Sequence, residues 1–185
     1  MTTLKAEKRS MDVKAKKLRR EGYVTGNLFG REIEGSIPLK FTKKEIEVLL
    51  KNNNKGSQVM LELDGKTYDA LIKEVDYNPL AHTVEEVDFQ ALVSNEMVHS
   101  VAEIILENEE MVVSGVLQDE LKEVAYKALP ADLVDKIKVD VAGMKIGDTL
   151  RVKDLEIAKN KNIHITTDLE SVMCNNVINC ICTGS

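Results

Sequence analysis

The 185-residue sequence contains no tryptophan, and aromatic residues make up only 4% of it. Apolar residues nevertheless account for 43% of the chain, so we expect hydrophobic cores built mainly from Val, Ile, Leu and Met. No apolar run approaches the roughly eighteen residues of a membrane span, and the N-terminus has no hydrophobic signal region. The sequence therefore predicts a cytoplasmic protein without a membrane partner.

Residues that carry chemistry are also sparse. The cysteines lie near the C-terminus, on or near a predicted final strand, without CxxC spacing: Cys174, Cys180 and Cys182. The three histidines are far apart and have no obvious metal-ligating neighbours. No nucleophile elbow or phosphate-binding glycine loop is present, and acidic pairs such as Glu85-Glu86 and Glu109-Glu110 are typical of solvated segments. We expect no enzyme activity, metal, cofactor or small-molecule substrate.

Charge is distributed unevenly along the chain. Residues 1–55 hold fourteen Lys/Arg and seven Asp/Glu, a net charge of +7, whereas residues 93–185 hold nine and sixteen, a net charge of −7. The overall charge of −6 therefore conceals a basic N-terminal surface able to neutralise phosphates. This asymmetry favours a nucleic-acid partner for the first part, although a charged helix face can also be merely solvated surface.

The positive residues concentrate around a predicted helix over residues 12–21, with Asp12 as its N-cap and Gly22 as its left-handed stop. Ala15 and Leu18 would face inward and leave a basic face exposed. We call the cations on and before this helix the basic cluster: Arg9, Lys14, Lys16, Lys17, Arg19 and Arg20.

The first 92 residues predict a small closed β-barrel with two helices. Thr42 and Glu45 form a capping-box pattern for the second helix, and Asp64-Gly65 is a strong two-residue hairpin signal. Alternating or turn-bounded segments predict strands at 3–9, 24–29, 35–41, 58–63, 66–72 and 84–92. So many short strands within about ninety residues suggest a barrel.

The remainder, residues 93–185, predicts an acidic antiparallel β domain with a short helix, so the chain is mainly β within an α+β class. The expected strands are 99–107, 110–117, 120–126, 137–141, 149–152, 163–167 and 171–182, with a helix at 130–136. We place the domain boundary near residues 92–96, where the charge changes sign.

The order of these features resembles a known family, the bacterial large-subunit ribosomal protein numbered twenty-five, in the long form also called general stress protein CTC. In the first domain the resemblance rests on "LKAEKR" at 4–9, "KKLRREG" at 16–22, "LFG" at 28–30 and "HTVEEVDFQAL" at 82–92. In the second it rests on "ALP" at 128–130, "KVDVAGMKIGDTLRVKDL" at 138–155 and the terminal strand. It covers essentially the whole chain.

The resemblance implies a structural ribosomal protein whose first domain binds 5S rRNA in the central protuberance, next to other large-subunit proteins. Arg9, Lys16, Lys17, Arg19 and Arg20 match basic positions of the family and would contact phosphates, and Lys14 belongs to the same cluster. Asp88, in "VDF", matches an acidic residue that accepts a hydrogen bond from a base amino group or orients a neighbouring donor.

Three residues on the expected RNA-facing surface depart from the family pattern. Phe29 stands where tyrosine is usual, so stacking is retained but a phenolic hydroxyl is lost. Glu86 replaces a usual histidine and Asp76 a usual glutamine, which places negative charge on a surface meant for phosphates. These departures motivate an alternative: a diverged stress-related paralogue that binds 5S rRNA weakly or not at all and acts as a protein-interaction module.

Overall fold

The computed structural model describes residues 2–112 and 114–177. Contacts between residues divide the chain into two compact units. The first contains Met1–Val98 with Leu129–Asp135, and the second contains His99–Ala128 with Lys136–Ser185. Each unit has its own strands and buried residues, and each is described separately.

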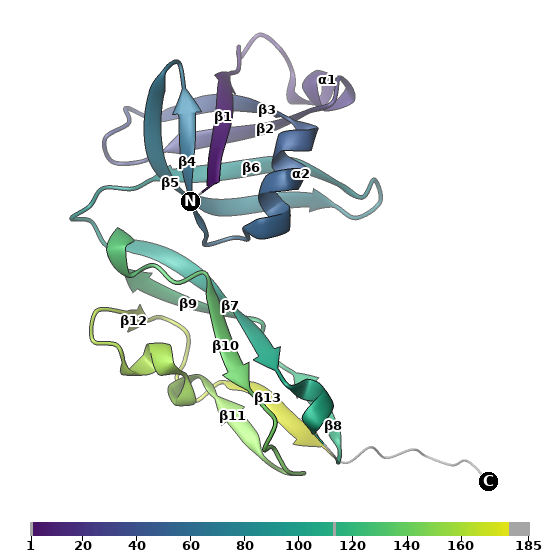
Figure 1. Ribbon diagram of the computed structural model, residues 1–185. Coiled ribbons are helices and arrows are strands. Elements are labelled where there is room, and N and C mark those ends of the chain that lie inside the picture. Colours follow the sequence, from purple (N-terminus) through teal and green to yellow (C-terminus); the bar gives the residue numbers. More distant parts are fainter. Residues whose placement is uncertain (1, 113, 178–185) are drawn as a thin grey trace. The chain divides into compact units, whose positions relative to one another are not determined.

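The first unit is a closed six-stranded barrel, which confirms the predicted architecture (Figure 1). Its strands follow the spatial order β1, β3, β2, β6, β5, β4. They span β1 (Thr2–Lys8), β2 (Tyr23–Phe29), β3 (Ser36–Thr42), β4 (Gln58–Leu63), β5 (Lys66–Asn78) and β6 (Thr83–Ala91).

Two parallel pairs close the barrel, β1 with β4 and β2 with β6, whereas the other neighbours are antiparallel. The β4–β5 hairpin confirms the Asp64-Gly65 prediction, since Leu63 pairs with Lys66 and both turn residues have positive φ, 50° and 77°. Closure leaves the barrel without a free edge of strands.

Two α-helices accompany the barrel, α1 (Ala15–Arg20) and α2 (Lys43–Asn52). The α2 capping box is confirmed, because Thr42 accepts a hydrogen bond from the Glu45 amide while the Glu45 side chain bonds back to the Thr42 amide. The predicted start of α1 is wrong: Lys14 is the N-cap, and Asp12 instead accepts a hydrogen bond from the Ser10 hydroxyl. Gly22 does follow the helix with φ 89°, as predicted.

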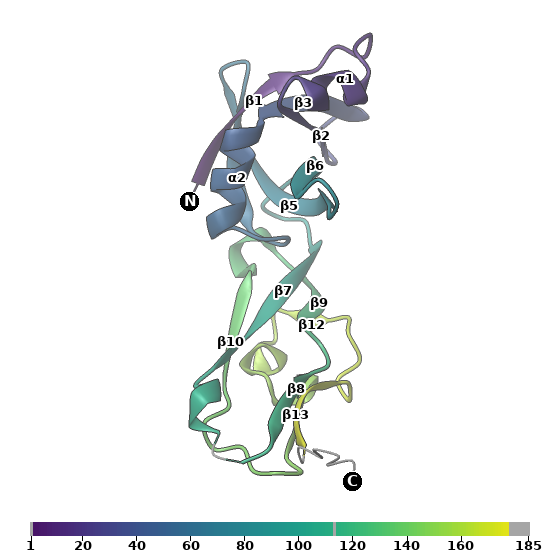
Figure 2. The ribbon, with the colours of Figure 1, turned by 90° about the vertical axis from the view of Figure 1, so that its right-hand side faces the viewer.

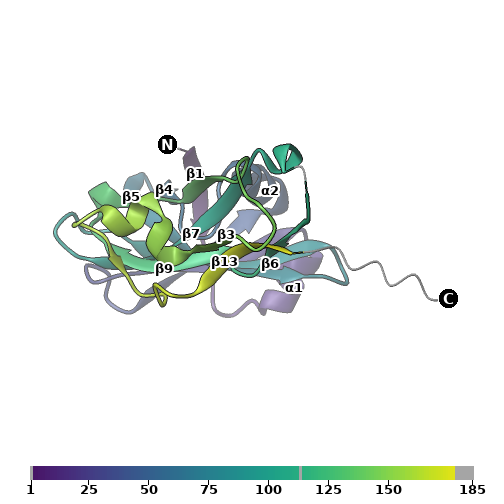
Figure 3. The same cartoon turned by 90° about the horizontal axis from the view of Figure 1, so that it is seen from below.

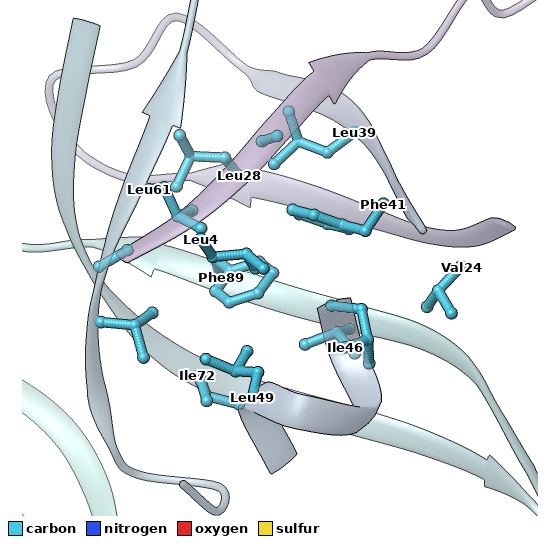
Figure 4. Packing of buried hydrophobic residues seen from close by; sticks show 14 of the residues in the cluster. Leu4, Val24, Leu28, Leu39, Phe41, Ile46, Leu49, Leu61, Ile72 and Phe89 are labelled. Atoms are coloured by element: carbon cyan, nitrogen blue, oxygen red, sulfur yellow. The ribbon is translucent and has the colours of Figure 1, made fainter. Parts of the chain in front are cut away.

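The barrel interior is filled by aliphatic side chains around two phenylalanines (Figure 4). The Phe41 and Phe89 rings lie 5.5 Å apart in a tilted arrangement. Helix α2 turns Ile46 and Leu49 into this core, where both are almost completely buried. Removal of these side chains from water stabilises the barrel and fixes which residues of each strand face outward.

The second unit contains two sheets (Figure 2). The first has the order β10, β7, β9, β12 and the second the order β11, β13, β8. Their bounds are β7 (Val98–Glu107), β8 (Val116–Asp119), β9 (Glu123–Ala128), β10 (Lys136–Asp140), β11 (Thr149–Arg151), β12 (His164–Ile165) and β13 (Val172–Val177). Four short 3-10 helices complete the described chain: η1 (Glu109–Met111), η2 (Pro130–Asp132), η3 (Val152–Asp154) and η4 (Glu156–Lys159).

Several details of this half differ from the sequence prediction. A strand over 110–117 is wrong, because Asn108 takes a left-handed conformation with φ 63°, η1 follows, and β8 begins only at Val116. The helix over 130–136 shortens to η2, since Leu133 is extended again. Strands β7 and β10 pair in parallel, so the domain is not entirely antiparallel. The expected strand over 171–182 is described only as β13, and Cys180 and Cys182 lie outside the described residues.

Among the described residues, neither α-helix is long and apolar enough to cross a lipid bilayer.

The β2–β6 contact leaves no room for a side chain at Gly26. A Cβ atom there would lie 2.1 Å from the Val87 carbonyl oxygen and 3.2 Å from the Phe41 ring. We expect Gly26→Ala to lower the free energy of unfolding by about 1–3 kcal/mol, measured by urea unfolding. Gly143→Ala is the matched control, because an added Cβ meets nothing within 4 Å. Equal stability of the two variants would contradict the tight approach.

Candidate nucleic-acid interface

Helix α1 presents most of the basic cluster to solvent. The helix lies beside β2 (Figure 2). Leu18 is its buried residue. Lys14, Lys16, Lys17 and Arg20 are exposed. Within residues 2–112 and 114–177, Lys14, Lys16 and Arg20 have no acidic partner, and Lys17 makes only a 3.9 Å contact with Glu21. These side chains can contact phosphates without first losing a strong ion pair within the protein.

Arg19 has a different environment from its neighbours on α1. Its guanidinium forms ion pairs with Glu85 at 2.9 Å and with Glu86 at 3.1 Å. It also donates from Nε to the Glu85 carbonyl oxygen at 3.2 Å and from Nη2 to the Thr25 hydroxyl at 3.4 Å. Four hydrogen bonds within the protein therefore engage a side chain that carries five N–H groups. Arg19 joins α1 to strands β2 and β6.

This arrangement corrects the interpretation of Glu85-Glu86 as merely solvated. Both carboxylates bind Arg19, and Glu85 additionally accepts a 2.7 Å hydrogen bond from Asn78. Their side chains are only about one-third exposed, at 35% and 30%. The single positive charge of Arg19 therefore compensates about half of the negative charge of this pair.

Arg9 is also partly used inside the protein. Its Nη2 donates to the Val13 carbonyl oxygen at 3.1 Å, which braces the loop that leads into α1. Its Nε is buried and has no hydrogen-bond partner in the described part of the chain. Arg9 thus shapes the start of the basic cluster, and its buried Nε is inaccessible to a ligand.

The outward face of β2 and β6 carries an ordered polar network. The parallel register places Thr25 beside Glu86 and Asn27 beside Asp88. Asp88 accepts hydrogen bonds at 3.1 Å from both the backbone amide and the side-chain amide of Asn27, and Glu86 accepts a third from the side chain at 3.3 Å. Two carboxylates therefore fix the Asn27 amide group so that its carbonyl oxygen is the free acceptor.

Asp88 orients the Asn27 side chain within the protein, because it accepts two hydrogen bonds from this residue. The sequence interpretation did not single out Asn27. The available signal was its polar side chain at an outward position of a predicted strand, but its partners on β6 lie about sixty residues away in sequence.

Four carboxylates line one shallow hollow on this outer face: Glu74, Asp76, Glu86 and Asp88. The β5–β6 register sets Asp76 opposite Glu86 and Glu74 opposite Asp88. Like charges directly opposite each other on a sheet repel. Glu86 is paired with Arg19, whereas Glu74 and Asp76 are exposed and have no cationic partner among the described residues. The hollow is therefore a negative region next to the basic helix.

The neighbouring part of the face is partly apolar. Phe29, at the end of β2, is half-buried between Ser36 of β3 and Gln90 of β6.

Lys40 of β3 is paired with Glu7 at 2.8 Å and lies over the Tyr23 ring. The hydrogen bond to Glu7 raises the pKa of Lys40. Lys40 therefore stays protonated and engaged rather than free for a ligand.

The structure thus divides the predicted site residues into three groups. Exposed cations lie on and before α1, an internal network joins Arg19 and Asp88 to other polar side chains, and Asp76 belongs to the acidic hollow together with Glu86. In the described ranges 2–112 and 114–177, no three Asp, Glu, His or Cys side chains are placed to hold a metal ion. A closed barrel with an exposed basic helix and a polar strand face is typical of a structural nucleic-acid-binding protein.

Comparison with known proteins identifies the particular family. Residues 4–89 match the ribosomal L25p family, and residues 97–178 match the C-terminal domain of ribosomal protein TL5. The large ribosomal subunit protein bL25 of Carboxydothermus hydrogenoformans is 32% identical over 176 residues, covering 90% of this chain and 87% of the relative. The bL25 proteins of Akkermansia muciniphila and Dictyoglomus thermophilum are 31% and 30% identical, covering 90% and 95% of this chain and 83% and 88% of theirs.

The chain therefore belongs to the bacterial bL25 family, in its long two-domain form. Proteins of this family are structural components of the large ribosomal subunit and not enzymes.

Arg19 and Arg20 are adjacent in sequence but have different surroundings, which predicts different effects on stability. Arg19→Ala should lower the free energy of unfolding by roughly 1–2 kcal/mol, because Glu85 and Glu86 lose their shared cation; partial exposure keeps the cost moderate. Arg20→Ala, at an exposed position, should change stability by less than about 0.5 kcal/mol. Urea unfolding of both variants measures the difference. A neutral Arg19 substitution would show that the network does not stabilise the fold.

Proposed function

We propose that this chain binds 5S rRNA in the central protuberance of the large subunit through its first domain, residues 1–92, in the cytoplasm. The observation that carries the proposal is the group of exposed cations on α1 without ion-pair partners among the described residues. Phosphate contacts by such side chains supply most of the affinity of RNA-binding proteins. Lys14, Lys16, Lys17 and Arg20 are the proposed phosphate ligands.

The engaged residues have supporting roles in this proposal. Arg9 and Arg19 hold the loop and the helix in place, and Arg9 adds a phosphate contact through its unused N–H groups. Asn27, oriented by Glu86 and Asp88, offers a carbonyl oxygen to a 2′-hydroxyl or a base amino group. Phe29 provides a ring surface for an unstacked base.

The charge on the β2–β6–β5 face sets a limit on how the RNA approaches. A phosphate about 4 Å from a carboxylate costs roughly 1 kcal/mol in water and about 4 kcal/mol at an effective dielectric constant of 20. The exposed carboxylates of Glu74 and Asp76 therefore keep the RNA backbone away from β5. We infer that phosphates follow α1, while only uncharged groups of the RNA meet the polar face of β2 and β6.

The acidic hollow favours a second candidate function. A diverged, stress-related member of the family would present the same fold as a protein-interaction module, with weak or no affinity for 5S rRNA. A titration of a 5S rRNA fragment separates the two, because the first candidate requires strong, salt-dependent binding, whereas the second predicts weak or no binding even in dilute buffer.

Removal of two exposed α1 cations should weaken 5S rRNA binding in a characteristic way. For Lys16→Ala combined with Arg20→Ala, we expect the dependence of log affinity on log salt to become shallower by roughly one unit per lost phosphate contact. The control is Lys44→Ala with Lys51→Ala, which removes the same charge from exposed positions on α2. Equal losses in the two double variants would indicate a general charge effect and would remove α1 from the interface.

The carboxylate of Asp76 should oppose the same binding reaction. Asp76→Gln removes one exposed negative charge without breaking a hydrogen bond or ion pair of the described chain, so affinity should rise by about fivefold, the equivalent of roughly 1 kcal/mol. Glu62→Gln on β4 is the control and should leave affinity unchanged. An Asp76 variant that binds like the parent protein would show that this carboxylate does not oppose RNA binding.

A further inference from the structure

The second unit contains a cleft that the proposed RNA contact does not use. It has a volume of about 280 Å³, and its lining residues come from β7, η1, the end of β8, the segment after β8 and β13. Figure 3 shows β7 and β13 of this unit from below. Apolar side chains of Ile105, Leu121 and Met173 contribute to its lining. Glu103, Glu109 and Asp119 add carboxylates, whereas Lys122 is the single cation of the lining.

Two carboxylates at this cleft lack a cationic partner within the described part of the unit. Lys138 is paired with Glu107, and both Arg151 and Lys153 are paired with Glu170. Glu109 and Asp119 have no ion-pair partner among the described residues. Burial, followed by the charges of Asp119 and Glu109, raises the pKa of the Cys174 thiol, in agreement with a negative local potential.

The size and charge of the cleft restrict what can occupy it. Ligand pockets for small molecules and cofactors usually measure roughly 300–1,000 Å³, so this cleft fits one or two side chains better than a whole ligand. An RNA strand is disfavoured, because its phosphates would face the unpaired carboxylates of Glu109 and Asp119. A polypeptide that places an apolar side chain in the cleft and Lys or Arg beside its rim satisfies both features.

We propose that this cleft is a docking site for a basic protein segment, one that presents an apolar anchor flanked by Lys or Arg. Charge complementarity selects the segment, and the apolar floor holds its anchor. This role goes beyond 5S rRNA binding and does not depend on it, because it belongs to the second unit alone. In a ribosomal protein, such a site lets an acidic domain join an assembly whose main component is a polyanion.

The test uses the full chain without RNA and a fluorescein-labelled synthetic peptide of alternating Lys and Leu. Fluorescence anisotropy should show saturable binding that weakens with added salt. Glu109→Gln should weaken peptide binding about threefold. The double variant Glu109→Gln with Asp119→Asn should weaken it about tenfold, as expected for the loss of exposed charge pairs. Glu156→Gln is the matched control, since both glutamates are exposed and begin a 3-10 helix. It should leave the affinity unchanged.

A second pair of peptides separates the contributions of charge and apolar anchor without altering the protein. Replacement of Leu by Ser should abolish saturable binding, and replacement of Lys by Glu should do the same. Retained binding of the Ser peptide, or equal weakening by Glu109→Gln and Glu156→Gln, would overturn the proposal. A 5S rRNA fragment whose affinity depends on Glu109 would also overturn it, because RNA rather than protein would then occupy the cleft.

Discussion

The parallel pairing of β2 with β6 is the constraint on which the candidate interface depends. Its register brings Asn27 beside Asp88 and Thr25 beside Glu86, so the outward polar network exists only in this alignment. A shift by one residue would turn every outward side chain into the core. The same pairing helps to close the barrel around Phe89, and it is so close that Gly26 has no space for a side chain. Core packing and the shape of the interface are therefore set by one contact.

Cations that look equivalent in the basic cluster have distinct physical roles. Arg19 pairs with two carboxylates and fixes the helix to the barrel, whereas Lys16 and Arg20 remain free to exchange solvent for a ligand. A guanidinium suits the first role, because its planar fork can serve several acceptors at once. The second role needs only positive charge on a mobile side chain. One short helix thus combines a structural anchor with an electrostatic surface.

The opposite charges of the two halves have a common physical explanation within a ribosome. A basic surface lowers its free energy by displacing counterions from RNA, whereas an acidic domain gains nothing from phosphates and instead complements basic proteins. The barrel itself also carries both kinds of surface, because the acidic hollow on β5 and β6 lies next to the basic helix. In the proposed RNA complex, this hollow confines the favourable approach of the RNA backbone to the side of α1. Under the same proposal, the positive and negative regions together define the orientation of the RNA as well as the affinity for it.

The sequence by itself determined the features that depend on neighbouring residues: the capping box at Thr42, the Asp64-Gly65 hairpin, the stop at Gly22 and the concentration of cations before it. Local backbone preferences and charge composition are encoded within a few residues, which is why these predictions were confirmed. The partners of Arg19, the orientation of Asn27 and the facing carboxylates of β5 and β6 were decided only by tertiary structure. The contacts of Arg19 and Asn27 join segments about sixty residues apart, and the facing carboxylates depend on the irregular register of β5 against β6. No local pattern states which side chains will meet across a closed barrel.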